Sequence, residues 1–149
     1  MQENQVRILV VDDEQDLCEI LKFNLEIEGY NVDTANSAEE ALGLDLSCYN
    51  LLLLDVMMGE MSGFALTRQL KADEKTQHIP VIFLTARDTE NDMLTGFNIG
   101  ADDYISKPFS IREVMVRVRA VLRRTVTVSI QDDAQPTLSY GGLKLNLNK

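Results

Sequence analysis

Four consecutive leucines at residues 51–54 have neither the two-residue period of a half-exposed strand nor the 3.6-residue period of an amphipathic helix. Such a short apolar run, bounded by polar and turn-forming residues, is typical of a central strand in a parallel sheet, where both faces are buried. The run ends at Asp55. Because a carboxylate at the end of a buried strand costs free energy unless it is paired, Asp55 is the first candidate functional residue.

Hydrophobic periodicity predicts that strands and helices alternate along residues 6–124. Strands are expected at residues 6–11, 30–35, 51–55, 81–85 and 104–106. Helices are expected between Glu14 and Gly29, at residues 37–46, 64–71 and 88–98, and from Ser110 to about residue 124. Ser37 and Ser110 each stand three positions before a glutamate, which is the pattern of a helix capping box. This alternation predicts a five-stranded parallel sheet with helices on both faces.

The alternation stops after residue 124. Residues 125–136 contain a polar stretch that ends at Pro136, and they are interpreted as a linker. In residues 137–149, leucine and tyrosine alternate with polar residues on either side of two adjacent glycines, which predicts a hairpin. Because a two-stranded hairpin is only marginally stable alone, these residues are expected to begin a second domain whose remainder is absent.

The composition is typical of a soluble globular protein, with 45% hydrophobic and 26% charged residues. No apolar run approaches the roughly 18 residues that a membrane helix requires, and the N-terminus has no cationic signal region. Cys18 and Cys48 lie in apolar contexts without metal-ligand spacing and are interpreted as reduced packing residues. A formal net charge of -10 opposes binding to nucleic acid by this fragment. These features predict a cytoplasmic protein with no membrane contact.

Two more acids, Asp12 and Asp13, follow the first expected strand. In an open parallel sheet, ligands bind beyond the carboxyl ends of the strands, where the strand order reverses. Asp12, Asp13 and Asp55 therefore meet if the first and third strands are neighbours. Two carboxylates about 5 Å apart repel by about 3 kcal/mol at an effective dielectric of about 20, so three of them need a cation or raised pKa values. A hydrated, open site of this kind favours Mg²⁺.

Polar and aromatic residues at the ends of the expected strands stand in a recognisable order. They are Asp12, Asp13, Asp55, Thr85, Tyr104 and Lys107, the last followed by Pro108. The arrangement resembles the receiver domain of two-component response regulators, over residues 6 to about 124. The sequence of residues 100–109 is similar to that of the OmpR/PhoB-type branch. The resemblance implies a flavodoxin-like fold with the strand order 2-1-3-4-5.

The resemblance implies that Asp55 accepts a phosphoryl group from a phosphohistidine of a sensor histidine kinase. It also implies Mg²⁺ ligation by Asp13, Asp55 and the backbone carbonyl of Met57, with Asp12 acting through water. One position in this loop departs from the family pattern, because Gly59 stands where a proline is usual. Glycine is more permissive in its backbone angles, so the loop is expected to hold the Met57 carbonyl less firmly.

The phosphoryl group itself would be bound by residues at the ends of the fourth and fifth strands. The resemblance implies that Lys107 pairs with one phosphoryl oxygen, and that Thr85 hydrogen-bonds another, with the Ala86 amide beside it. Phosphorylation would then move Thr85 toward the phosphate while Tyr104 turns inward. This movement is expected to alter the face built from the fourth helix, fifth strand and fifth helix.

Receivers of the OmpR/PhoB branch commonly dimerise across that same face. Asp103 and Arg117 match one pair of residues that forms salt bridges between the two copies. Glu113 also matches, but Met93 stands where its basic partner is usual. The resemblance therefore implies a phosphorylation-dependent homodimer that is weaker than usual or built differently.

The resemblance assigns residues 1–124 to a receiver, residues 125–136 to a linker and residues 137–149 to the truncated start of a winged-helix domain. The complete protein is expected to be a transcription regulator that binds DNA through the missing C-terminal domain, and not a turnover enzyme. Two alternatives stay open. An aspartyl-phosphate phosphatase of the haloacid-dehalogenase class normally has a second aspartate where this chain has Met57. A protein-interaction module of the same fold would not be phosphorylated at all.

Overall fold

The computed structural model describes residues 5–58, 60–86 and 90–134. Its strands form one parallel sheet in the order β2-β1-β3-β4-β5, which confirms the expected fold class and strand order. The strands are β1 (Arg7–Val11), β2 (Asn31–Ala35), β3 (Leu51–Leu54), β4 (Val81–Thr85) and β5 (Asp103–Ser106). The helices are α1 (Gln15–Ile27), α2 (Ala38–Leu42), the 3-10 turn η2 (Leu46–Cys48), α3 (Gly63–Ala72), α4 (Glu90–Ile99) and α5 (Ile111–Ala134).

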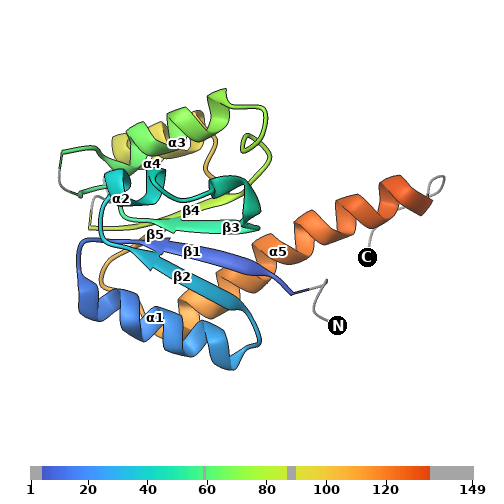
Figure 1. The fold of residues 1–149 in the computed structure, drawn as a ribbon, viewed down its shortest axis with the longest axis horizontal. Helices are drawn as coiled ribbons and strands as arrows, with labels where there is room; N and C mark the ends of the chain where they lie inside the picture. Colours follow the sequence, from blue (N-terminus) through green and yellow to red (C-terminus); the bar gives the residue numbers. More distant parts are fainter. Residues whose placement is uncertain (1–4, 59, 87–89, 135–149) are drawn as a thin grey trace. The chain divides into compact units, whose positions relative to one another are not determined.

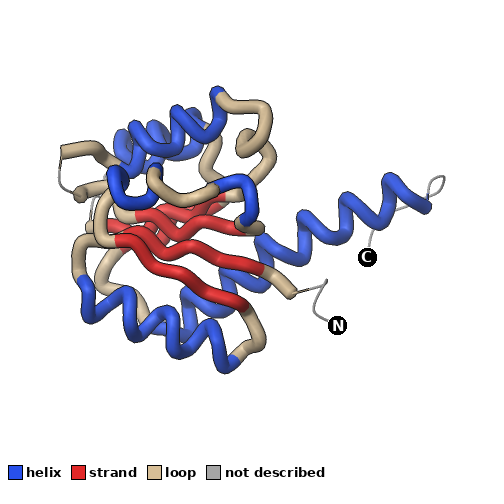
Figure 2. The backbone as a smooth tube through the Cα atoms, viewed as in Figure 1, coloured by secondary structure: helices blue, strands red, loops and turns tan. Residues whose placement is uncertain are grey.

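The sheet lies between two layers of helices (Figure 2). Helices α2, α3 and α4 cover one face, while α1 and the first turns of α5 cover the other (Figure 1). The four leucines of β3 are all fully buried because successive side chains of a strand point to opposite faces, and both faces are covered here. Burial of both faces therefore explains why residues 51–54 show no hydrophobic periodicity, as the sequence predicted.

Side-chain caps fix where two of the helices begin. The Ser37 hydroxyl accepts a hydrogen bond from the Glu40 N–H at 2.9 Å, and the Glu40 carboxylate accepts one from the Asn36 N–H at 2.8 Å. At the start of α5, the Ser110 hydroxyl accepts a hydrogen bond from the Glu113 N–H at 3.0 Å. Both predicted serine caps are thus confirmed. The prediction that the second helix continues to residue 46 is wrong, because α2 ends at Leu42 and a separate turn, η2, follows.

The chain divides into two compact units, Met1–Val118 and Arg119–Lys149. The first contains the whole sheet. In the second, residues 119–134 continue α5, so the predicted end of this helix near residue 124 is wrong, and the first ten residues of the expected linker are helical. The expected hairpin at residues 137–149 lies outside the described residues. Within the described part of the chain, no helix is long and apolar enough to cross a membrane.

Candidate functional site

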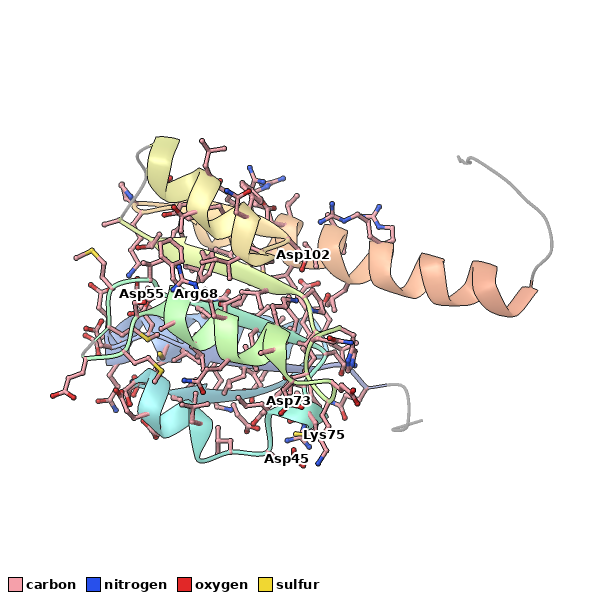
Figure 3. The ribbon with its side chains drawn as sticks, turned by 90° about the horizontal axis from the view of Figure 1, so that it is seen from above. Asp45, Asp55, Arg68, Asp73, Lys75 and Asp102 are labelled. Atoms are coloured by element: carbon pink, nitrogen blue, oxygen red, sulfur yellow. The ribbon has the colours of Figure 1, made fainter. Side chains whose placement is uncertain are left out.

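Three carboxylates lie together where β1 and β3 end. Asp12 and Asp55 each follow directly on one of these neighbouring parallel strands, and the Asp55 N–H donates to the Val11 carbonyl at 2.9 Å. One carboxylate oxygen from each of Asp12, Asp13 and Asp55 lies within 4.8 Å of the others. Asp12 is 1% exposed and Asp55 is 4% exposed. Figure 3 shows Asp55 at the opposite end of the sheet from Asp45.

Lys107 brings a positive charge into this group from the loop after β5. Its ammonium nitrogen lies 3.1 Å from an Asp12 carboxylate oxygen and 3.5 Å from an Asp55 carboxylate oxygen. A third acid, Glu14, lies 3.1 Å from the same nitrogen, and the sequence did not indicate this contact. The parallel sheet brings Lys107 to Asp12 across 95 positions of sequence.

Burial and charge shift the pKa values of the central groups. Burial raises the pKa of Asp12 to about 6, with a further increase from the neighbouring Asp55 carboxylate. Burial also raises the pKa of Asp55, while Lys107, the Met57 N–H and the Thr85 side chain act in the opposite direction. Burial by itself would lower the pKa of Lys107, but its hydrogen bonds to Glu14 and Asp12 raise it above the ordinary value. The amine is therefore a fixed cation at neutral pH.

The ends of β4 and β5 carry the other expected residues. Thr85 is fully buried, and its side chain acts to lower the pKa of Asp55. Ala86 follows Thr85 and is exposed. Tyr104 is 5% exposed, and its ring makes an edge contact with the Phe83 ring at a centroid separation of 5.9 Å. The Tyr104 side chain thus lies inside the fold in this structure.

The donor set fits a hard divalent cation. Carboxylate oxygens from three residues converge. Among the described residues, Lys107 alone places a positive charge within salt-bridge distance of Asp12 and Asp55, so one ammonium faces three carboxylates. Oxygen ligands with a residual negative charge are those that Mg²⁺ prefers. Met57 is half exposed, and its N–H donates to the Asp55 carboxylate at 3.2 Å. Ligation by the Met57 carbonyl stays a prediction, and Gly59 lies outside the described residues.

The backbone of Asp12 is held by two residues that the sequence did not point to. Its carbonyl oxygen accepts a hydrogen bond from the Cys18 thiol at 3.3 Å and another from the Asn36 side-chain amide at 3.2 Å. Burial raises the pKa of Cys18 to about 11, so the thiol keeps the proton that it donates. The interpretation of both cysteines as packing residues is confirmed for Cys18 and wrong for Cys48, which is exposed.

The residues expected at a dimer face are already paired within one chain. The Arg117 guanidinium lies 3.1 Å and 3.0 Å from the two carboxylate oxygens of Asp103. Its Nε lies 3.5 Å from a Glu113 carboxylate oxygen. Met93 belongs to α4, but its side chain lies outside the described residues. A pair between two copies would therefore replace the contact between Asp103 and Arg117 or add to it.

Comparison with known proteins extends the structural picture. A family model described as "Response regulator receiver domain" matches residues 8–119. The chain is 46% identical over 143 residues to "Transcriptional regulatory protein CpxR" of Escherichia coli (strain K12), covering 94% of this chain and 60% of that protein. It is 43% identical over 143 residues to "Uncharacterized transcriptional regulatory protein YkoG" of Bacillus subtilis, covering 93% and 60%. The chain thus spans about three-fifths of the length of these relatives.

Solved structures resemble the fold over most of the chain. The non-phosphorylated HemR receiver domain from Leptospira biflexa has a TM-score of 0.75 and 34% identity, covering 79% of this chain and 94% of that chain. The BeF3-activated DrrB receiver domain has a TM-score of 0.73 and 32% identity, covering 80% and 98%.

Proposed function

This chain belongs to the response regulator receiver family, and on that premise we propose that Asp55 accepts a phosphoryl group from a phosphohistidine of a sensor histidine kinase. The observation that carries the proposal is the grouping of Asp55 with two other carboxylates and with the Lys107 ammonium, 3.5 Å away. The raised pKa of Asp55 reflects the cost of burying this carboxylate. A phosphoryl group adds negative charge at this buried position and therefore requires a cation nearby, which Lys107 supplies.

In the proposed reaction, a carboxylate oxygen of Asp55 attacks the phosphorus atom. The new oxygen–phosphorus bond forms as the phosphorus–nitrogen bond breaks, and the imidazole nitrogen of the kinase keeps the electron pair. Lys107 pairs with one phosphoryl oxygen, while the Thr85 hydroxyl and the Ala86 amide donate to another. Phosphorylation adds a charge of about -1.5 to -2, which explains the need for a fixed ammonium that stays protonated at neutral pH.

We assign the metal to the same end of the sheet. Asp13, Asp55 and the Met57 carbonyl would hold Mg²⁺, and Asp12 would act through water. When bound, the ion neutralises the charge that develops on the transferred group. The chain's own contribution is to bury Asp12 and Asp55 and to keep three carboxylates within 4.8 Å despite their mutual repulsion.

The response to phosphorylation is proposed to start at Thr85. Its hydroxyl, which acts to lower the pKa of the unmodified Asp55, would move with the phosphoryl group and change the packing of Tyr104 and of the face made by α4, β5 and α5. Thr85→Ala is expected to keep phosphorylation but to weaken the chemical-shift change at the Tyr104 amide when acetyl phosphate is added. An equal shift change in Thr85→Ala and parent would contradict this role.

The complete protein is proposed to control transcription, with DNA bound by a C-terminal domain that lies beyond this chain. The receiver is assigned to residues 1–124, and residues 137–149 to the beginning of that DNA-binding domain. Dimerisation through α4, β5 and α5 would place an acid of a second copy beside Arg117, which is paired with Asp103 within the chain. The cytoplasmic location and the absence of a turnover activity stay predictions.

Incubation with acetyl phosphate and MgCl2, followed by intact-mass spectrometry, tests the assignment of Asp55. We expect one phosphoryl adduct on the parent, none on Asp55→Asn, and an unchanged adduct on Asp45→Asn, a matched control at the opposite end of the sheet. Steady release of phosphate would favour the phosphatase alternative, and the absence of any reaction would favour a docking module. Because a receiver related in structure is described as BeF3-activated, the same mimic should compete with the adduct.

A further inference from the structure

Two side chains from separate parts of the fold donate to the main-chain carbonyl of Asp12. Cys18, in α1, donates through its thiol at 3.3 Å, and Asn36, between β2 and α2, donates through its amide at 3.2 Å. The Cys18 side chain is buried, at 1% exposure, and the two donors lie 3.9 Å from each other. We refer to Cys18 and Asn36 as the carbonyl donor pair.

Other contacts of Asp12 do not replace this pair. The Asp12 N–H donates to the Ala35 carbonyl at 3.1 Å, which continues the sheet. One Asp12 carboxylate oxygen accepts the Glu14 N–H at 2.9 Å and the other pairs with Lys107 at 3.1 Å. The Glu14 contact restrains the chain beyond Asp13, and the others hold the side chain and N-terminal side of Asp12. Only the donor pair binds the carbonyl of the peptide group that joins Asp12 to Asp13.

The position of Asp13 depends on that peptide group. The Asp13 residue is exposed, and its carboxylate accepts no hydrogen bond from the described residues, although one of its oxygens lies within 4.8 Å of oxygens of Asp12 and Asp55. Because a peptide unit is rigid and planar, donors that fix the Asp12 carbonyl also fix the direction in which the chain enters Asp13. Without them, the Asp13 side chain has more ways to point away from the other two acids.

We propose that Cys18 and Asn36 are positioning residues for the divalent-metal site, acting through the Asp12–Asp13 peptide to aim the Asp13 carboxylate. The inference rests on the proposed magnesium site, and it adds two residues that act through the Asp12 carbonyl and are not themselves proposed as ligands of the metal or the phosphoryl group. Partners that orient metal ligands in this way commonly change metal affinity by 10-fold or more when they are removed.

The capping box of α2 extends this contact outward. Asn36 is exposed, but its backbone N–H donates to the Glu40 carboxylate at 2.8 Å, and Glu40 in turn donates its N–H to the Ser37 hydroxyl. The beginning of α2 thereby restrains Asn36, so that its side chain can act on the Asp12 carbonyl with little loss of conformational freedom.

Magnesium titrations of variants test the donor pair. MgCl2 is added to ¹⁵N-labelled protein, and the dissociation constant is read from the backbone amide shifts of Asp13. Cys18→Ala and Asn36→Ala each remove one donor, and the double variant removes both. Cys18→Ser keeps a hydroxyl donor at the same place and serves as the conservative rescue. The spectra also report whether each variant is folded.

Two controls match the chemistry of the substitutions. Cys48→Ala removes the other, exposed cysteine. Asn24→Ala removes a side-chain amide that donates to a backbone carbonyl, that of Ile20, at 2.8 Å on the exposed surface of α1. We expect both controls to bind Mg²⁺ like the parent, and the double variant to bind about tenfold more weakly. Cys18→Ser is expected to stay close to the parent.

The rate of acetyl phosphate labelling separates positioning from general damage. The double variant is expected to need about tenfold more MgCl2 for half-maximal labelling, but to reach a rate within about twofold of the parent at saturating MgCl2. Unchanged Mg²⁺ affinity in the folded double variant, with binding intact in the parent, would overturn this inference and leave the proposed function standing. Failure of the parent itself to bind Mg²⁺ would refute the proposed function and the inference with it. Because Cys18 is buried, Cys18→Ala could fail to fold. In that case the Mg²⁺ affinity of Asn36→Ala, a substitution at an exposed residue, tests the inference.

Discussion

Gly63 opens α3 and lies against the main chain of Asp55, so that even a single methyl group has no room there. A Cβ atom at this position would stand 2.3 Å from the Asp55 carbonyl oxygen and 3.0 Å from its carbonyl carbon. These are backbone atoms, and they cannot rotate away as a flexible side chain could. The Gly63 N–H also donates to the Val56 carbonyl at 2.9 Å, which holds the two segments together.

We therefore expect Gly63→Ala to push α3 away from Asp55. Relief of the contact with the carbonyl oxygen requires a shift of about 1 Å, since ordinary van der Waals contact of a Cβ atom begins at 3.4 Å. Insertion of a methyl group into a packed site costs about 1–3 kcal/mol, and the change from glycine to alanine in a helix returns at most about 1 kcal/mol. The free energy of unfolding is expected to fall by about 1–2 kcal/mol.

Urea unfolding followed by far-UV circular dichroism measures the loss of stability, and acetyl phosphate labelling measures the effect on Asp55. Labelling of Gly63→Ala is expected to slow, because a displacement of about 1 Å at a reacting group can cost as much as 100-fold in rate. Gly43→Ala is the matched control, since its Cβ would meet its nearest atom, the Glu40 carbonyl oxygen, at 3.4 Å. Stability and labelling rate both equal to the parent in Gly63→Ala would refute the reasoning.

Three further predictions concern buried polar groups. Tyr49→Phe removes an O–H that donates to the Asp33 carboxylate at 2.7 Å, so the free energy of unfolding in urea is expected to fall by about 1 kcal/mol; no change would mean that water replaces this bond at no cost. Iodoacetamide at pH 8 is expected to label Cys48 and to spare Cys18, whose thiol is buried and has its pKa raised to about 11; equal labelling in the folded chain would contradict the described burial. In EDTA, the pKa of Asp12 is about 6 in the folded chain and about 3.9 in the unfolded chain. Between these two pH values the folded state keeps a proton that the unfolded state releases. The stabilising contribution of Asp12 is therefore full below about pH 4 and is lost as the pH rises through about 6. Urea unfolding of parent and Asp12→Asn across this range is expected to show a difference in the free energy of unfolding that changes with pH.

Much of the fold and part of the site could be predicted from residue patterns alone. The unbroken apolar runs of β1 and β3 indicated strands buried on both faces, and hence a parallel sheet covered by helices. Such a sheet places Asp12 and Asp55 at one edge because neighbouring parallel strands end on the same side. The resemblance to the receiver family added Lys107, which lies within salt-bridge distance of both acids.

Other features depended on contacts that have no local pattern. Glu14 belongs to an acidic run that is equally compatible with a solvated helix start. Its contact with Lys107 exists because β1 and β5, with β3 and β4 between them, end at the same edge of the parallel sheet. Cys18 occupies an apolar context that predicts packing, and its thiol donates to a carbonyl as well. The helix that continues to Ala134 was missed because a polar sequence such as residues 131–134 is as compatible with an exposed helix as with a linker.

The sequence by itself determined the order and burial of the strands, because those follow from short-range periodicity and from the need to remove apolar side chains from water. It also determined which acids could meet, since parallel strands share a carboxyl edge. Only the tertiary structure decided how that edge is held: which carboxylates share the Lys107 ammonium, which donors hold the Asp12 carbonyl, and how closely Gly63 approaches Asp55. Those are distances of a few ångströms between residues far apart in the chain, and they arise from the packing of whole elements, which no local pattern records.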